Sequence, residues 1–169
     1  FPMTSLPSPL QRVSALWQYF SGWIDRAAPL AALAARAYLA QVFFLAGLTK
    51  IRDWDTTLLL FTEEYRVPLL SPALAAMAGT AGELVLPVLL LFGLAGRFAA
   101  LGLSVVNAVA VISLSEIAPA ALQLHITWGV LLAALVFHGM DRWSVDRARS
   151  VGRHLSKDNP ARLAEQPIR

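Results

Sequence analysis

Four apolar runs stand out along the chain, and each has about the length of a membrane-spanning helix. They cover Pro29 to Leu48, Pro72 to Leu94, Phe98 to Leu114 and Leu122 to Met140. A bilayer core about 30 Å thick needs roughly 20 apolar residues in a helix, so each run predicts one membrane span. Only Ala95, Gly96 and Arg97 separate the second run from the third, and so short a link predicts antiparallel neighbours. The expected fold is an all-α membrane protein, a bundle of four transmembrane helices.

A different helical pattern precedes the first run. Apolar side chains recur there at spacings of three and four residues, at Leu10, Val13, Trp17, Phe20 and Ile24. Such an amphipathic helix favours the headgroup plane of a membrane, where tryptophan rings are also favoured, and docking on a partner is the alternative. We therefore expect residues 1–27 to be an interfacial segment, residues 28–146 to form the transmembrane domain and residues 147–169 to be a basic tail. A second, shorter amphipathic piece is expected from Lys50 to Leu70.

The basic residues indicate how the bundle is oriented. Arg12 and Arg26 precede the first span, Arg97 lies between the second and third, and seven more Lys and Arg follow the fourth. The loop from Ser115 to Ala121 has no positive charge, and the three basic residues after the first span are offset by four acidic ones. The positive-inside rule then predicts that both termini are cytoplasmic.

Composition agrees with a lipid environment and removes several classes of function. The chain is 57% hydrophobic and 15% charged, whereas soluble domains are about 45–50% apolar and about 25% charged. A net charge of +3 is explained by arginines next to anionic headgroups, so the lipid bilayer, and no nucleic acid, is the expected partner. The chain has no cysteine, which excludes disulfides and thiol chemistry. Phosphate-binding loops, nucleophile elbows and zinc-protease motifs are not found either.

Three polar residues inside the runs are the first candidates for a site. Ionisable groups in a bilayer are costly, so each needs a partner or a purpose. From the helix rise, Glu83 lies roughly 16 Å deep, Asn107 about 14 Å and Arg36 about 10 Å, on three different spans. One interpretation is a structural clasp in which Arg36 reaches toward Glu83. The other is a proton-transfer site, or a site for a quinone-like small molecule.

Two further groups of residues extend this list. Arg36, Ala40, Phe43, Gly47 and Lys50 form one stripe at helical spacing, and the stripe should face the bundle interior. The fourth run carries His125, Trp128 and His138. The two histidines lie about 20 Å apart along a helix, so they cannot share a metal or a haem. Haem ligation by His125 with a partner elsewhere is less favoured than a hydrogen-bonded structural role, and no metal site is expected.

Several short motifs follow one another in a fixed order between Arg36 and Asp146. They are the early Arg36, Gly47-Leu48-Thr49-Lys50, Gly82-Glu83-Leu84, Phe92-Gly93-Leu94 with Arg97, and the ending from His138 to Asp146. The order and spacing of these motifs resemble the DoxX family of small bacterial membrane proteins. The chain departs from the family where His138-Gly139-Met140 replaces a glycine-proline-glycine ending, and in its developed amino-terminal helix.

The resemblance implies a four-helix protein of the bacterial inner membrane, related to the small subunit of thiosulfate:quinone oxidoreductase. Members are linked to sulfur metabolism, quinone reduction and oxidative-stress complexes. The leading hypothesis is thus an accessory or anchoring subunit of a redox complex that could bind a quinone or lipid near Glu83. A proton-coupled carrier or permease and a pure membrane scaffold are the alternatives, and an enzyme acting alone ranks last. Other redox subunits are expected partners, and a homo-oligomer is left open.

Overall fold

The computed structural model describes residues 9–138 and shows only helices connected by short loops. These helices are α1 (Pro9–Arg52), α2 (Trp54–Glu63), α3 (Pro72–Phe92), α4 (Gly96–Ser113) and α5 (Pro119–His138). Within this part of the chain, all of them except α2 are long and apolar enough to cross a membrane. The predicted all-α, multi-pass membrane fold is confirmed. The expected basic tail, and the family-like ending after His138, lie outside the described residues.

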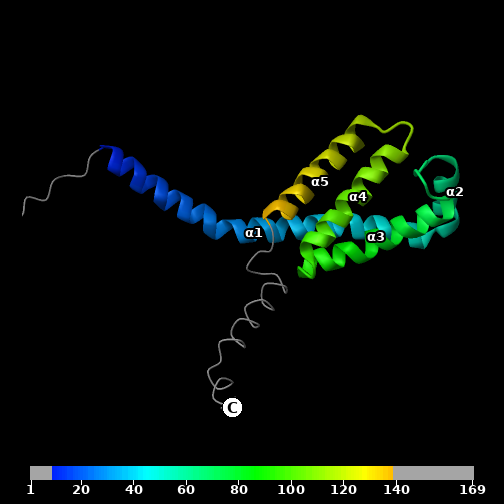
Figure 1. Ribbon diagram of the computed structural model, residues 1–169, viewed down its shortest axis with the longest axis horizontal. Helices are drawn as coiled ribbons and strands as arrows, with labels where there is room; N and C mark the ends of the chain where they lie inside the picture. Colours follow the sequence, from blue (N-terminus) through cyan, green and yellow to red (C-terminus); the bar gives the residue numbers. More distant parts are fainter. Residues whose placement is uncertain (1–8, 139–169) are drawn as a thin grey trace, which may run out of the picture.

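Helix α1 joins two segments that the sequence analysis separated. It runs without a break through the predicted boundary near residue 27, has 44 residues and contains Pro29. At 1.5 Å per residue it is about 66 Å long, roughly twice the thickness of a bilayer core. Proline has no N–H and clashes with the preceding turn, so Pro29 marks where this helix bends most easily. The part before Pro29 extends from the bundle as an arm (Figure 1). Its placement on the membrane surface stays a prediction.

Local sequence signals end and begin the helices around the second span. Asp53 caps α2 by accepting a hydrogen bond from the Thr56 N–H at 3.0 Å. The side-chain and backbone hydrogen bonds with Thr56 hold the pKa of the Asp53 carboxyl below its ordinary value. Ser71 caps α3, and Gly93 ends it with a left-handed φ of 64°, a conformation that costs glycine little. The amphipathic piece expected from residue 50 to 70 is therefore the shorter α2, followed by a loop.

Helix α3 lies at the centre of the bundle, between α1 and α4, while α5 packs mainly on α4. Glycines set the closest approaches. A Cβ atom added at Gly47 would lie 2.9 Å from Leu84 Cγ, and one added at Gly102 would lie 2.8 Å from Leu86 Cδ1. Such small residues let helices pack closely in lipid. The largest core cluster contains Leu39, Phe43, Leu90, Ala99, Ala100, Leu103 and Leu132.

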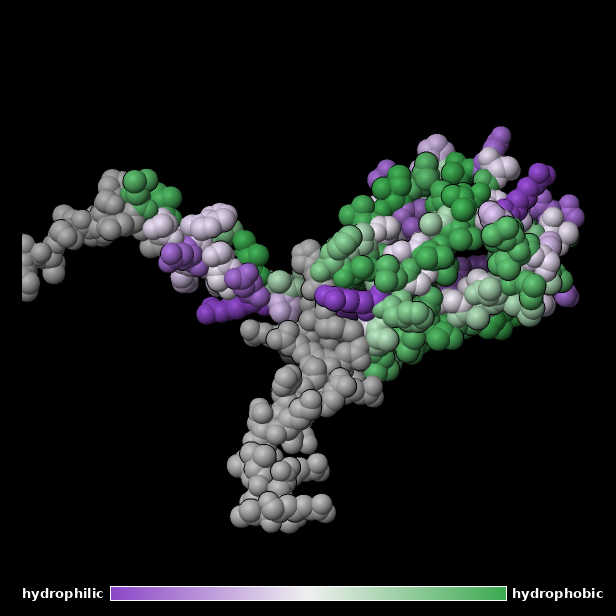
Figure 2. Space-filling view, viewed as in Figure 1, coloured by the Kyte–Doolittle hydropathy of each residue, from purple (hydrophilic) through white to green (hydrophobic). Residues whose placement is uncertain are grey.

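The outer surface of the bundle matches an apolar solvent. Figure 2 shows mostly hydrophobic residues along the helices, with hydrophilic residues gathered toward the ends of the bundle. Exposed apolar side chains on the spans include Val105, Ile112 and Val130, each more than 60% exposed. In water this surface would be costly, whereas acyl chains cover it at no cost.

Candidate functional site

A charged pair joins the end of α1 to the middle of α3. Lys50 Nζ donates to Glu83 Oε2 at 2.5 Å. The Lys50 side chain is 23% exposed and that of Glu83 is 10% exposed. A buried charge is costly unless an opposite charge lies beside it. Lys50 and Glu83 compensate each other in this way.

Packing of the flanking residues fixes the position of the pair. Gly47 lies level with Glu83, since a Cβ added at Gly47 would be 3.1 Å from the Cβ of Glu83. Lys50 follows one turn later, on the same face of α1. The buried Thr57 Oγ1 donates to the Lys50 carbonyl at 3.0 Å, which ties the end of α1 to α2. The close approach of α1 and α3 at Gly47 and the Thr57 hydrogen bond from α2 therefore fix the position of the ion pair.

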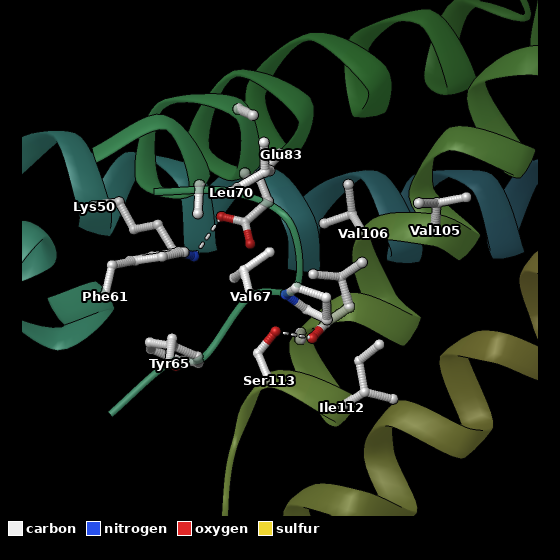
Figure 3. Close-up of a pocket in the computed structure, with 16 residues that line it drawn as sticks. Lys50, Phe61, Tyr65, Val67, Leu70, Glu83, Val105, Val106, Ile112 and Ser113 are labelled. Atoms are coloured by element: carbon white, nitrogen blue, oxygen red, sulfur yellow. Dashed lines mark hydrogen bonds and ion pairs between the residues drawn. The ribbon is translucent and has the colours of Figure 1, made fainter. Parts of the chain in front are cut away.

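The pair forms part of the wall of a cavity of about 430 Å³. Apart from Lys50 and Glu83, almost all of the lining is apolar and comes from α2, α3, α4 and the loop that connects α2 to α3. Figure 3 shows Phe61, Val67, Val105 and Val106 around the same space. A volume in this range and a mostly apolar wall with a few polar groups are typical of sites for small molecules.

Tyr65 also lines the cavity. Its ring lies 4.9 Å from that of Phe61, measured between centroids. Burial, with the negative charges of Glu64 and Glu83, raises the pKa of the Tyr65 hydroxyl above its ordinary value. The phenol thus stays neutral around pH 7 and can donate or accept a hydrogen bond.

The predicted clasp between Arg36 and Glu83 is not formed. Arg36 is buried, with 5% exposure, but it lies eleven residues before Gly47, which is level with Glu83. At 1.5 Å per residue this separates the two levels by about 16 Å. The antiparallel register therefore brings Arg36 toward the end of α3. Lys50 occupies the position beside Glu83 that was expected for Arg36.

Asn107 lies at about the level of Glu83 along the bundle but faces another helix. Its neighbour Val106 packs at Gly82, one residue from Glu83, whereas Asn107 itself bonds to α5. Asn107 Nδ2 donates to the His125 carbonyl at 2.9 Å, and Asn107 Oδ1 lies 2.8 Å from His125 Nδ1. Because the amide nitrogen is used as a donor, Oδ1 accepts and Nδ1 carries the hydrogen. The pair thus joins α4 to α5 and is separate from the cavity.

Trp128 connects α5 to α1. Its indole Nε1 donates to the Tyr38 hydroxyl at 3.1 Å, and its ring makes edge contacts with Phe43 and His125 at centroid distances of 5.9 and 4.9 Å. Aromatic side chains therefore form the contact between α1 and α5 at this point. The expected interior stripe is confirmed at Ala40, Phe43 and Gly47, which are buried.

The sequence analysis missed the residues that complete the cavity, because they come from α2, from a loop and from the end of α4. Phe61, Tyr65, Val67 and Ser113 are the main ones. No sequence signal pointed to these four residues. Gly47 pointed only to the pairing of Lys50, since a small residue marks a close helix approach and brings the residue one turn later to the facing span. No group of three or more His, Asp or Glu side chains that could hold a metal is found among residues 9–138.

The fold and this site define a class, a small multi-pass α-helical membrane protein with an ion pair in the wall of a cavity. The DoxX family model matches residues 31–116, which include both Lys50 and Glu83. That match covers about half of the chain, and the protein belongs to the DoxX family. Neither a search of curated proteins nor a search of solved structures finds a match.

Proposed function

We propose that the protein is an accessory subunit of a redox complex in the bacterial inner membrane, and that it binds a quinone head group in the cavity at Lys50 and Glu83. The observation that carries the proposal is a charged pair placed in the wall of an apolar cavity of about 430 Å³. A clasp that only fixed helix register would need no such space beside it, since protein interiors are close-packed.

The polar groups of the cavity suit both redox forms of a quinone. A quinone supplies two carbonyl acceptors, and its reduced form supplies two hydroxyl donors. The Lys50 ammonium can donate to a carbonyl oxygen, and the Glu83 carboxylate can accept from a hydroxyl. Tyr65 can do either. The apolar remainder of the lining suits the ring and its substituents.

The electrons for such a reaction must come from elsewhere. The chain has no cysteine, and the family resemblance links it to quinone-reducing complexes. We therefore assign the electron donor to a partner subunit and the binding of the quinone to this chain. In the proposed orientation both termini are cytoplasmic, in accord with Arg12 and Arg26 in the first part of α1 and with Arg97 at the start of α4.

Titration with decylubiquinone of the purified protein in nanodiscs tests the proposal. The double variant Lys50→Met/Glu83→Leu removes both charges together and should stay folded. Each hydrogen bond between the quinone and a charged group is worth about 1.5–3 kcal/mol. The affinity of the double variant for decylubiquinone should therefore be at least about tenfold lower than that of the wild type. The matched control is Gln41→Leu, a polar-to-apolar change on the same helix and away from this cavity. Equal affinity of the double variant and the control would mean that the pair is a structural clasp only.

A further inference from the structure

The cavity beside Lys50 and Glu83 is covered at one end by a loop. Residues 64–71, here called the strap, connect α2 to α3, and Val67, Pro68 and Leu70 of the strap line the cavity. The Arg66 N–H donates to the Ser113 carbonyl at 2.8 Å. An antiparallel bridge also pairs Tyr65 with Leu114. The strap is therefore fixed to the end of α4 and covers the cavity there (Figure 3).

The same cavity reaches the outer surface of the bundle between α3 and α4. Val105 and Ile112 line it and are 62% and 65% exposed. Ala78, on the facing side of α3, also lines it and is exposed. Exposed apolar side chains on membrane spans face acyl chains. The cavity thus opens toward lipid, at the half of the membrane that surrounds the Lys50 end of α1.

Helix packing explains why the opening lies at this level. Toward the other end of α3 the two helices are in close contact, since a Cβ added at Gly82 would lie 3.1 Å from Val106 Cγ2. Toward the strap this contact is lost, because a Cβ added at Gly79 would lie 3.7 Å from Phe61 Cζ of α2 and would have no atom of α4 within 4 Å. Small residues that have no close neighbour on the facing helix leave space, and here that space connects the ion pair with the lipid-facing surface.

The charges of the lining restrict what kind of head group fits. Lys50 and Glu83 neutralise each other. The Ser113 hydroxyl already donates to the Val109 carbonyl at 2.6 Å. A phosphate head group would bring negative charge into an apolar space with no unpaired cation in its lining, which is costly. The lining therefore favours an uncharged ring with hydrogen-bonding oxygens over a phospholipid head group.

We infer that the ligand is a lipid-tailed molecule that enters sideways from the bilayer between α3 and α4. Its neutral ring lies at Lys50 and Glu83, and its hydrocarbon tail passes Val105 and Ile112 into the surrounding acyl chains. This inference rests on the proposed function for the head group and adds the entry route and the need for a tail.

Two quinones with the same head group test the route, decylubiquinone and its tail-less parent 2,3-dimethoxy-5-methylbenzoquinone. Both are titrated against the full-length protein in nanodiscs of phosphatidylethanolamine and phosphatidylglycerol. Affinities refer to the aqueous concentration of each quinone, which is corrected for the amount that enters empty nanodiscs. The wild type should bind the tailed quinone at least about tenfold more tightly, since each buried CH₂ group adds affinity. Val105→Trp should reduce the affinity for decylubiquinone about tenfold or more.

The matched control is Leu101→Trp. Leu101 is 53% exposed, one turn from Val105 along α4, and it does not line the cavity. Its tryptophan should leave the affinity for decylubiquinone within about twofold. Equal effects of the two tryptophans, or equal wild-type affinities for the two quinones, would overturn the lateral route and leave head-group binding intact. If neither quinone bound to the wild type, the proposed function would be overturned as well.

A measurement on the unmodified protein covers the case in which Val105→Trp does not fold. A decylubiquinone analogue with a diazirine at the end of its tail should label α4 between Val105 and Ile112, or α3 near Ala78. Excess decylubiquinone should suppress this labelling, and added phospholipid should not. Labelling confined to the strap, or labelling that decylubiquinone does not suppress, would show that the tail does not leave between α3 and α4.

Discussion

The energy of the Lys50–Glu83 pair provides the most detailed prediction, because the two partners differ in what they can do alone. In Lys50→Met the Glu83 carboxylate, 10% exposed, loses its cation in the middle of α3. In Glu83→Leu the Lys50 ammonium, 23% exposed, lies at the end of α1. There it can extend toward water and toward the negative end of the helix dipole.

These differences set the expected magnitudes. Breaking a buried ion pair costs about 3–5 kcal/mol, and an exposed pair is worth less than about 1 kcal/mol. We expect Lys50→Met to lower the free energy of unfolding by about 2–4 kcal/mol and Glu83→Leu by about 1–2 kcal/mol, from the same principles. The double variant Lys50→Met/Glu83→Leu should lie within about 1 kcal/mol of the wild type, since two apolar side chains replace two paired charges.

Unfolding by SDS in mixed micelles, followed by tryptophan fluorescence, gives the four free energies of this cycle. The coupling energy is the effect of the double variant minus the sum of the two single effects. With a double variant close to the wild type, we expect its magnitude to be about 3–6 kcal/mol. Additive single effects, or a Glu83→Leu variant less stable than Lys50→Met, would refute the reasoning. Arg36→Ala serves as the comparison, because its effect should add to that of Glu83→Leu.

Four other predictions follow from local geometry and from the charge distribution. Gly47→Ala should destabilise the bundle by about 1–3 kcal/mol in the same SDS assay and weaken quinone binding, because its Cβ would meet Leu84 Cγ at 2.9 Å. Gly93→Ala should cost about 1 kcal/mol in that assay, because φ is 64° there. The raised pKa of Tyr65 gives stability that is present below about pH 10 and is lost as the pH rises further. Above about pH 10 the free energy of unfolding should therefore fall less steeply with pH in Tyr65→Phe than in the wild type. A reporter fused after Arg169 should be active only in its cytoplasmic form, and periplasmic activity would overturn the orientation.

The spans could be predicted from the sequence because lipid leaves the backbone few alternatives. A run of about 20 apolar residues in a bilayer must satisfy its own backbone hydrogen bonds as a helix. The predicted starts at Phe98 and Leu122 differ from the observed Gly96 and Pro119 by only a few residues, which is the usual uncertainty of helix ends. The continuity of α1 through Pro29 was not predicted, since proline is compatible with either a break or a bend.

The candidate site could be predicted only in part, because a sequence gives the depth of a residue but neither the register nor the facing of its helix. Asn107 lies at about the level of Glu83, yet its amide faces His125 on α5. The expected partner of Glu83 was Arg36, whereas the contact at Gly47 sets a register that brings Lys50 to it. The cavity depends on how the strap crosses the end of α4, and no local pattern encodes that arrangement.

The central claim is that the pair and the cavity together hold a quinone, and the quinone content of the purified protein tests it most directly. The wild type and Lys50→Met/Glu83→Leu are purified in parallel in mild detergent, and the quinone in each lipid extract is measured by mass spectrometry against protein amount. We predict near-stoichiometric quinone in the wild type and a loss of at least about tenfold in the double variant, as the lost hydrogen bonds require. Equal quinone content in the two proteins, or none in the wild type, would contradict the claim.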